Sequence, residues 1–310
     1  CTLENFVFGD TPTPEAVGSF VRELFTLGDE FDVSLYELSA AHDIRPLVAR
    51  TLLTYLELLY FIEGGTPFYA NYKFKPLMTS AELLDHFEGE RRQFVADILR
   101  RSRKAKTLFD VDVDRVANEL NTPRTRIIAA LDYLGEKQML EVRAAGVRHR
   151  YRVLMRPDDI DALVDKMVER TQRRERDELA RLRQVVELIE YDGCQTAMLA
   201  EHFGEERDAC GHCSWCLGDK TPVKVPGHAG HLGESGPAAE VDLAAVDQAL
   251  ALRRSNPAAL ASPRQIARLL CGVSCPSLSK AKLTKNELFG HLDRTPFDAV
   301  MSACADAMDS

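Results

Sequence analysis

The sequence of 310 residues has no apolar run approaching the roughly 18 residues of a membrane span, and it has no secretory signal peptide. It also has no G-x-x-x-x-G-K-[ST] motif, the loop that cradles nucleotide phosphates, and no partner acidic motif. These absences argue against a membrane partner and against a chain that hydrolyses ATP by itself. We expect a cytoplasmic globular protein, long enough for two or three domains.

Positive charge is in the minority, with 39 Lys and Arg against 48 Asp and Glu and a net charge of −9. The average hides a segregation along the chain. Residues 91–183 hold 23 basic and 16 acidic residues, a net charge of +7, so the remaining residues carry −16. A basic middle between acidic ends indicates a polyanionic partner for the middle. A set of solvated helical faces is the alternative.

Cysteine is sparse, at 8 residues, and three of these lie within seven positions. That distribution, without a secretory signal, is typical of metal ligation in a reducing compartment rather than of disulfides. The spacing is C-x15-C-x2-C-x2-C over residues 194–216. Four thiolates leave no open position on tetrahedral zinc, so we predict a structural Zn²⁺ site formed by Cys194, Cys210, Cys213 and Cys216.

Other readings of this cluster stay open. An iron–sulfur cluster also uses four cysteines, and a disulfide pair is a further alternative. His202 or His212 could replace one of the cysteines. Trp215, the only Trp, either packs against the preceding helices or stacks on a base.

An internal repeat covers the first half of the chain. A shift of 78 positions places residues 35–63 on residues 113–141, and it aligns Leu38 with Val116, Leu53 with Leu131, Tyr55 with Tyr133 and Leu56 with Leu134. Each copy predicts a short helix, a polar turn and a longer helix with apolar spacings of three and four. A strand pair should follow, around Gly64-Gly65 in the first copy and around residues 144–146 in the second. Helix–turn–helix followed by a β-hairpin is a winged helix.

The sequence therefore predicts a mostly α fold with small β-wings: tandem winged helices, a zinc-binding helical hairpin and a small helical C-terminal domain. The hairpin helices should cover residues 158–192 and 196–203, and Gly204 should end the second. The expected parts are a first winged-helix-like domain at 1–80, a second winged helix at 81–156, the hairpin with the zinc module at 157–220, a Pro- and Gly-rich linker at 221–240 and a helical tail at 241–310.

The second copy carries the candidate DNA contacts. Winged helices place the second helix in the major groove and the wing on the backbone or minor groove. Two arginines begin that helix, and three alternate on one wing strand; further basic residues precede the unit and could reach phosphates. The candidates are Arg124, Arg126, Arg148, Arg150, Arg152, Arg101, Arg103 and Lys104. Ion pairs with Asp132 or Glu136 are the alternative role for the arginines.

The first copy is acidic, with 5 basic and 15 acidic residues over positions 1–90. Its wing is aromatic. Alternation places Phe68, Tyr72 and Phe74 on one face and Tyr69 on the other. These rings could close a small core or dock against another domain.

Two stretches resemble the zinc-binding module of RecQ-family DNA helicases: residues 194–205, C-Q-T-A-M-L-A-E-H-F-G-E, and residues 210–216, C-G-H-C-S-W-C. In that family a helical hairpin ends in a Phe-Gly-Glu element and precedes a tight cluster of three cysteines. The four cysteines here fall on the family's zinc ligands, and the resemblance covers about residues 175–218. The opening residues, C-T-L-E-N-F-V-F-G-D, resemble the segment after the second motor lobe in some bacterial RecQ-like proteins.

The chain also departs from the family pattern. The family usually places its winged helix after the zinc module, whereas both expected winged helices precede it here. Ser214-Trp215 stands where the family often has Asp or Asn. Residues 241–310 lack the signature of a helicase-and-RNase-D C-terminal domain.

The resemblance implies a DNA-binding, post-motor region of a bacterial RecQ-like 3′–5′ DNA helicase, acting in DNA repair, recombination or replication at the nucleoid. ATP and Mg²⁺ would belong to N-terminal motor lobes absent from this chain. The start at Cys1 rather than Met favours a fragment, and a processed start is the alternative. Some RecQ helicases part the duplex with an aromatic wing tip, for which Tyr69 is the candidate. The alternatives are a stand-alone winged-helix DNA-binding regulator with a structural zinc site and a protein-interaction scaffold.

Overall fold

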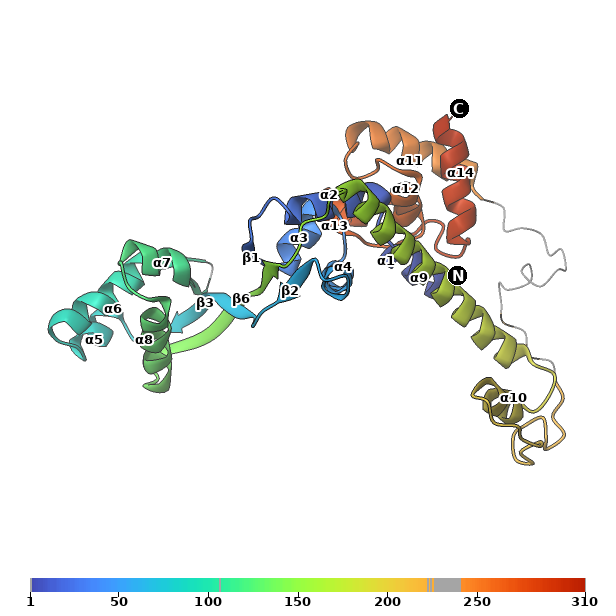
Figure 1. The fold of residues 1–310 in the computed structure, drawn as a ribbon, viewed down its shortest axis with the longest axis horizontal. Coiled ribbons are helices and arrows are strands. Elements are labelled where there is room, and N and C mark those ends of the chain that lie inside the picture. Colours follow the sequence, from blue (N-terminus) through green and yellow to red (C-terminus); the bar gives the residue numbers. More distant parts are fainter. Residues whose placement is uncertain (1, 106, 222, 224, 226–240, 310) are drawn as a thin grey trace. The chain divides into compact units, whose positions relative to one another are not determined.

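The structure is a computed structural model that describes residues 2–105, 107–221, 223, 225 and 241–309 (Figure 1). Most of the expected linker at 221–240 lies outside the described residues. The chain divides into two compact units. Unit 1 comprises residues 1–25, 38–52 and 157–310, and unit 2 comprises residues 26–37 and 53–156. Residues 1–80, expected as one domain, are thus shared between the two units.

The fold is mostly helical, as the apolar spacing predicts. The helices of the first half are α1 (Thr2–Asp10), α2 (Pro14–Leu24), α3 (Leu35–His42), α4 (Pro46–Leu58), α5 (Ser80–Asp85), α6 (Gly89–Arg101), α7 (Val113–Glu119) and α8 (Arg124–Glu136). Those of the second half are α9 (Ile160–Glu190), α10 (Gln195–His202), α11 (Leu243–Ser255), α12 (Pro263–Leu270), α13 (Pro276–Lys280), η1 (Leu283–Lys285) and α14 (Phe297–Asp309). No helix within the described residues is long and apolar enough to cross a membrane.

The internal repeat is visible in the backbone. The bounds of α4 and α8 differ by 78 residues at both ends, and α3 and α7 begin 78 residues apart. The left-handed residues repeat as well: Asp43 (φ 54°) matches Asn121 (φ 47°) in the turn between the helices, and Tyr60 (φ 60°) matches Gln138 (φ 54°) after the second helix. Few non-glycine residues adopt such φ values, so their recurrence at the same offset indicates two copies of one helix–turn–helix.

The strands form a single six-stranded sheet in unit 2. They are β1 (Glu30–Val33), β2 (Ile62–Gly64), β3 (Phe68–Pro76), β4 (Arg103–Lys104), β5 (Phe109–Asp112) and β6 (Leu140–Val153). The order is β1-β6-β3-β5-β4, and β2 also pairs with β6. The pairs are all antiparallel.

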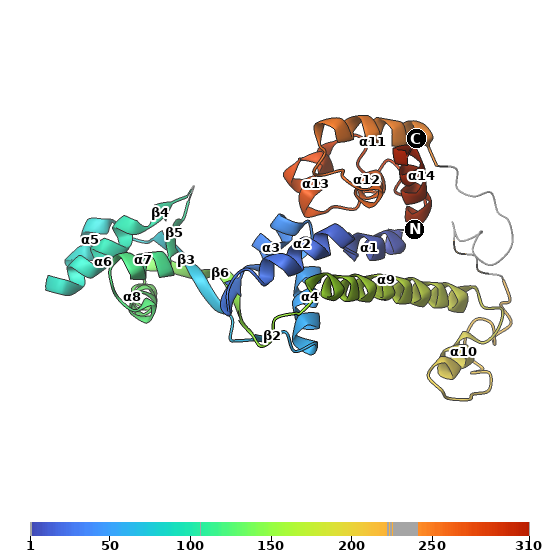
Figure 2. The same ribbon diagram turned by 45° about the horizontal axis from the view of Figure 1, so that its top comes forward.

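The two expected wing hairpins are not formed, which corrects the prediction from turn residues. Residues 140–153 make one continuous strand, and Gly146 adopts φ +64° inside it instead of turning the chain back. β2 and β3 run in the same direction along β6, with Ile62 opposite Val153 and Pro76 opposite Leu140. Their registers on β6 differ by one residue, as a bulge between Gly64 and Phe68 requires. Together they form a long two-stranded ribbon (Figure 2), and residues 77–139 are inserted at its tip.

The inserted residues form a core with the ribbon. Helices α6, α7 and α8 contribute apolar residues spaced by three and four, such as Ile127, Leu131 and Leu134, all fully buried. The strands contribute Phe74 from β3 and Val111 from β5 to the same cluster. Helices therefore cover one face of this part of the sheet, and no helix among the described residues of unit 2 covers the other face.

Unit 1 is organised along α9. Asp159 caps its start by accepting hydrogen bonds from the backbone N–H groups of Asp161 and Ala162. Its first turns bury Leu163, Val164 and Met167, and the helix packs against α1 and α2.

The tail helices α11–α14 form their own apolar core, which Phe8 of α1 joins by stacking on Phe297 with ring centroids 4.8 Å apart. This core is tied to the rest of unit 1 by buried charges. Arg264 donates to both carboxylate oxygens of Glu175 on α9, at 2.7 and 3.1 Å. The expected small helical tail domain is thus docked on the other helices of its unit.

Candidate functional site

The segment that carries the cysteines follows the end of α9, as the predicted helical hairpin requires. After α9 ends at Glu190, Cys194 occupies the N-cap of α10. α10 ends at His202, and Gly204 adopts φ +82°, a conformation that glycine tolerates. Residues 205–221 then loop back toward Cys194.

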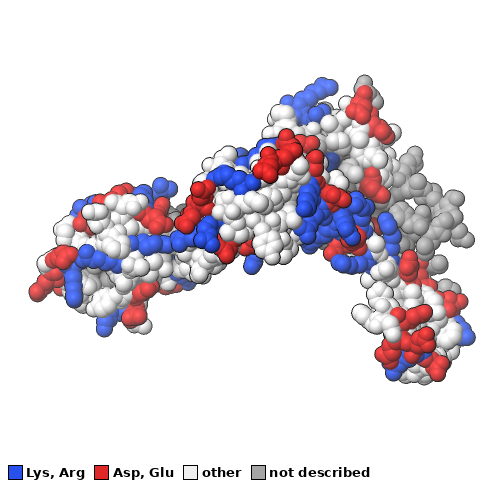
Figure 3. Space-filling model, viewed as in Figure 1, with Lys and Arg blue, Asp and Glu red and all other residues white. Residues whose placement is uncertain are grey.

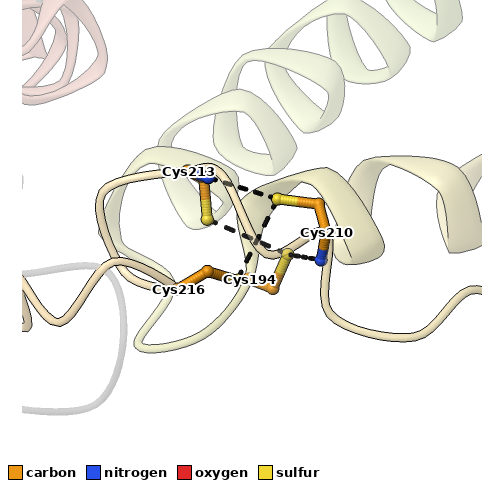
Figure 4. A group of neighbouring side chains, drawn as sticks. All are labelled: Cys194, Cys210, Cys213 and Cys216. Atoms are coloured by element: carbon orange, nitrogen blue, oxygen red, sulfur yellow. Dashed lines mark hydrogen bonds between the residues drawn. The ribbon is translucent and has the colours of Figure 1, made fainter.

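The four predicted cysteines converge on one point. Their sulfur atoms all lie within 4.8 Å of one another. Cys194 Sγ is 3.9 Å from Cys213 Sγ, and Cys210 Sγ is 4.0 Å from Cys216 Sγ (Figure 4). Zinc–sulfur bonds of about 2.3 Å in a tetrahedron give sulfur–sulfur edges of about 3.8 Å. The geometry therefore fits a four-cysteine zinc site with no open coordination position.

Backbone donors support the sulfurs. The N–H of Cys210 donates to Cys194 Sγ at 3.2 Å, and the N–H of Cys213 donates to Cys210 Sγ at 3.3 Å. Hydrogen bonds from the His212 backbone and the Thr196 side chain lower the pKa of Cys210 to about 5. A backbone bond from Gly211 acts in the same sense on Cys216, but burial and the neighbouring thiols raise the pKa of Cys216 to about 12.

The opposite pKa shifts of Cys210 and Cys216, whose sulfurs lie 4.0 Å apart, are those of two neighbouring thiols that repel each other when both are ionised. All four can be thiolates together only when a cation shares their charge, and a divalent metal supplies that charge. The donor set therefore fits the structural zinc predicted from the spacing. Zinc held in this way would tie Cys194 at the start of α10 to the loop of residues 210–216.

The two neighbouring histidines are not among the residues whose ligand atoms converge. His212 is exposed, and its Nδ1 lies 2.8 Å from the carbonyl oxygen of Cys210. His202 is exposed and packs edge-on against Phe203. Trp215 donates from Nε1 to Asp192 at 3.2 Å, and the Lys220 ammonium lies 4.6 Å from the centre of its ring. In the described residues, the four cysteines are the group placed to hold a metal.

The surroundings of the cluster are acidic. Residues 184–220 hold 8 acidic and 2 basic residues, a net charge of −6. α10 has no buried residue, and only Gly193 and Cys194 are buried within residues 191–221. The segment of residues 191–221 therefore lacks an apolar core of its own, and it does not present a basic surface.

The two arginines at the start of α8 lie over aromatic rings. The Arg124 guanidinium is 4.6 Å from the centre of the Phe68 ring, donates to the Tyr69 carbonyl at 2.8 Å and pairs with Asp114 at 3.3 Å. The Arg126 guanidinium is 4.3 Å from the centre of the Phe94 ring and pairs with Glu90 at 2.6 Å.

The β6 arginines differ in how firmly they are held. Arg148 pairs with both Asp32 and Glu37, and its side chain is 28% exposed. Arg152 is 59% exposed and pairs with Glu63 at 2.6 Å. Arg150 is exposed, and its guanidinium is 5.1 Å from the centre of the Phe68 ring. Phe68 is thus contacted by arginines from both α8 and β6.

The remaining predicted DNA residues lie near β4. Arg101 pairs with Asp97 at 2.8 Å and with Glu119 at 3.0 Å, which holds it at the end of α6. Arg103 and Lys104 form β4 and are exposed. Tyr69 lies inside the ribbon opposite Val147, not at a hairpin tip, and its side chain is 47% exposed.

Sequence reasoning missed the ring partners of these arginines. Phe68 was expected in an aromatic wing, with no link to Arg124 or Arg150, and no role was predicted for Phe94. The distances in sequence, 56 residues from Phe68 to Arg124 and 82 to Arg150, leave no local signal for such contacts.

Comparison with protein families identifies this region. A family model described as RecQ zinc-binding matches residues 157–217, which include α9, α10 and all four cysteines. Comparison with curated proteins finds no match to the chain. The family match and the four-cysteine geometry together support a RecQ-family zinc-binding module at residues 157–217.

Proposed function

We propose that this chain is the DNA-binding, zinc-stabilised accessory region of a bacterial RecQ-like 3′–5′ DNA helicase that acts in DNA repair, recombination or replication at the nucleoid. The observation that carries the proposal is the four-cysteine site on the α9–α10 hairpin, within the residues that match the RecQ zinc-binding family. ATP hydrolysis with Mg²⁺ would belong to motor lobes outside these residues. The repeated pairs α3–α4 and α7–α8 would be its helix–turn–helix elements.

The charge distribution supports different roles for the zinc module and for unit 2. The zinc module is acidic, so its role in this proposal is structural. Figure 3 shows a row of Lys and Arg side chains on unit 2, whereas Asp and Glu outnumber Lys and Arg around α10, by 8 to 2 over residues 184–220. A polyanion would therefore contact unit 2, where α8 and β6 bring Arg124, Arg126 and Arg150 beside Phe68 and Phe94.

The ion pairs of these arginines do not prevent contact with phosphates. Exposed pairs such as Arg126–Glu90 and Arg152–Glu63 are weak because water and salt screen them, so a phosphate can replace the carboxylate. Rings beneath Arg126 and Arg150 hold the guanidinium groups in place. Arg148 and Arg101 each pair with two carboxylates, which favours a structural role for both.

The test is duplex binding across a salt series, measured by fluorescence anisotropy. The triple variant Arg126→Gln, Arg150→Gln and Arg152→Gln should weaken binding and lower the slope of log K against log salt by about 2.7, since each phosphate contact contributes about 0.9. Arg254→Gln, which removes an exposed charge from α11, is the matched control and should leave the slope unchanged. An unchanged slope in the triple variant would move the DNA site elsewhere.

The helicase context has a separate test. The reading frame upstream of Cys1 should encode two motor lobes with a phosphate-binding loop. A start codon directly before Cys1 would instead favour a stand-alone DNA-binding regulator.

A further inference from the structure

The sheet of unit 2 has one open face. In the order β6-β3-β5-β4, the side chains of Phe74, Val111 and Leu140 point into the helix-covered core and are 1% exposed or less. Successive residues of a strand point to opposite faces, so their neighbours in sequence lie on the uncovered face. Tyr69 and the opposite residue Val147 form one row on this face, with exposures of 47% and 44%.

Basic residues lie further along the same face, beyond the Asn71–Ala145 pair. Lys73 of β3 lies directly opposite Arg143 of β6, and on its other side Asp110 of β5 separates it from Arg103 of β4. Lys75 lies one further step along the same face. Like charges directly opposite one another destabilise a sheet. Glu141 pairs with Arg143, so the charge left to attract an anion at this position is that of Lys73.

The acidic residues of this face are already engaged. Asp110 accepts a hydrogen bond from Asn71 at 2.9 Å, Asp112 caps α7 by accepting from the Arg115 N–H, and Glu141 pairs with Arg143. Lys73, Lys75 and Arg103 are exposed, and none of them forms an ion pair within the part of the chain that the structure describes. Their charge is available to a ligand.

We propose that this open face binds single-stranded nucleic acid. An unpaired base stacks on Tyr69 beside Val147, and the phosphates of the same strand contact Lys73, Lys75, Arg103 and Arg143. An exposed aromatic ring on the same face as a row of cations is the combination that single-strand platforms use, because every unpaired base has a stacking face and every linkage has a phosphate. In a duplex the bases already stack on one another and leave no free face for Tyr69.

The inference rests on the proposed function, since it assumes that the chain binds nucleic acid. The inference differs from the proposed function in the surface used and in the ligand, which is single-stranded rather than duplex. The duplex contacts involve Arg126, Arg150 and Arg152, while the open face uses Tyr69 with Lys73 and Lys75. It also gives Tyr69 a role other than opening a duplex from a wing tip.

The experiment uses the full chain and labelled oligo(dT), oligo(U) and duplex DNA in anisotropy titrations. Tyr69→Ala should weaken single-strand binding by about 5- to 150-fold, the loss expected for one base–aromatic stack, and leave duplex affinity unchanged. Tyr69→Phe keeps the ring and should retain affinity. Tyr36→Ala removes a tyrosine of α3 that is 78% exposed and should have no effect.

The lysines are tested by salt dependence. Lys73→Gln combined with Lys75→Gln should lower the salt slope on oligo(dT) by about 1.4, since each contact on a single strand contributes about 0.7. Tyr69-dependent binding of either oligo(dT) or oligo(U) supports the inference, and their ratio shows which sugar is preferred. If Tyr69→Ala and Tyr36→Ala bind single strands equally, while duplex binding still depends on Arg126, Arg150 and Arg152, only this inference fails. A chain that binds no nucleic acid refutes the proposed function as well.

Discussion

Loss of one zinc ligand should unfold the zinc module and spare the tail core. The substitution is Cys213→Ser, which removes a sulfur that lies 3.9 Å from Cys194 Sγ. Residues 191–221 bury only Gly193 and Cys194, whereas a buried apolar side chain of Val, Leu or Phe size contributes about 1.5–3 kcal/mol. Structural zinc contributes about 10–16 kcal/mol in small zinc-binding peptides. The metal, not apolar burial, should therefore keep this segment folded.

Two measurements test whether the metal keeps this segment folded. Elemental analysis should find one zinc per wild-type chain and none in Cys213→Ser. Hydrogen exchange should show lost amide protection over residues 191–221 in the variant, with protection kept in α11–α14, whose core includes Leu270, Phe297 and Val300. Iron in place of zinc would support the iron–sulfur alternative.

The control is His202→Ala. His202 is exposed and packs against Phe203 rather than the sulfurs, so this variant should keep its zinc and its exchange protection. If metal-free Cys213→Ser retained wild-type protection over residues 191–221, the claim that zinc holds the module together would be refuted.

Two further predictions concern buried charges in unit 1. Burial lowers the pKa of His42 below 6.5, and Glu23 opposes this shift. The stability that neutral His42 contributes is therefore complete above about pH 6.5 and is lost as the pH falls through its folded-state pKa. His42→Gln should show a smaller drop in Tm between pH 7.5 and 5 than wild type, and parallel pH profiles would contradict this. Glu175→Ala leaves the Arg264 guanidinium, 16% exposed, without its partner and should lower the free energy of unfolding by about 3 kcal/mol. Arg181→Ala breaks the exposed Arg181–Glu178 pair and should cost less than about 1 kcal/mol in the same urea titration; equal losses would show that burial of the pair does not matter.

The features that the sequence predicted well are set by local spacing. Apolar positions at three and four residues predicted the helix that became α8, because a helix presents such residues on one face. The zinc ligands were predictable for a similar reason. Three of the four lie in one short loop, and the fourth begins the helix before it, so few arrangements of the chain can bring them together.

The strand pairing was not predictable from turn residues. Gly146 follows two alanines and suggested a hairpin, but it adopts its left-handed conformation within β6. Turn-forming residues show only that the backbone can bend at their position. The pairing partner is decided by which face must be buried, and for β3 that requirement is set by Phe74, which enters the core of α6–α8.

The ion-pair partners of the arginines could not be predicted from nearby residues in the sequence either. Asp132 and Glu136 were the acids expected in such ion pairs, and they lie on the same helix, 6 and 10 residues after Arg126. The structure instead pairs Arg126 with Glu90, and it pairs Arg148 with Asp32, which is 116 residues away in sequence. Surface ion pairs are weak, so they follow the tertiary structure and do not determine it.

The two copies of the repeat cannot be separate modules, despite their matching helices. A simple tandem of winged helices would close each copy with strands that follow its own second helix. Here β3, which follows the second helix of the first copy, lies between β5 and β6 of the second, and Phe74 is part of that core. The C-terminal part of β6, which belongs to the second copy, pairs with β1 and β2 of the first. Each copy thus depends on a strand of the other, and the continuous strand β6 couples their folding, because its displacement would remove partners from β1, β2 and β3 together.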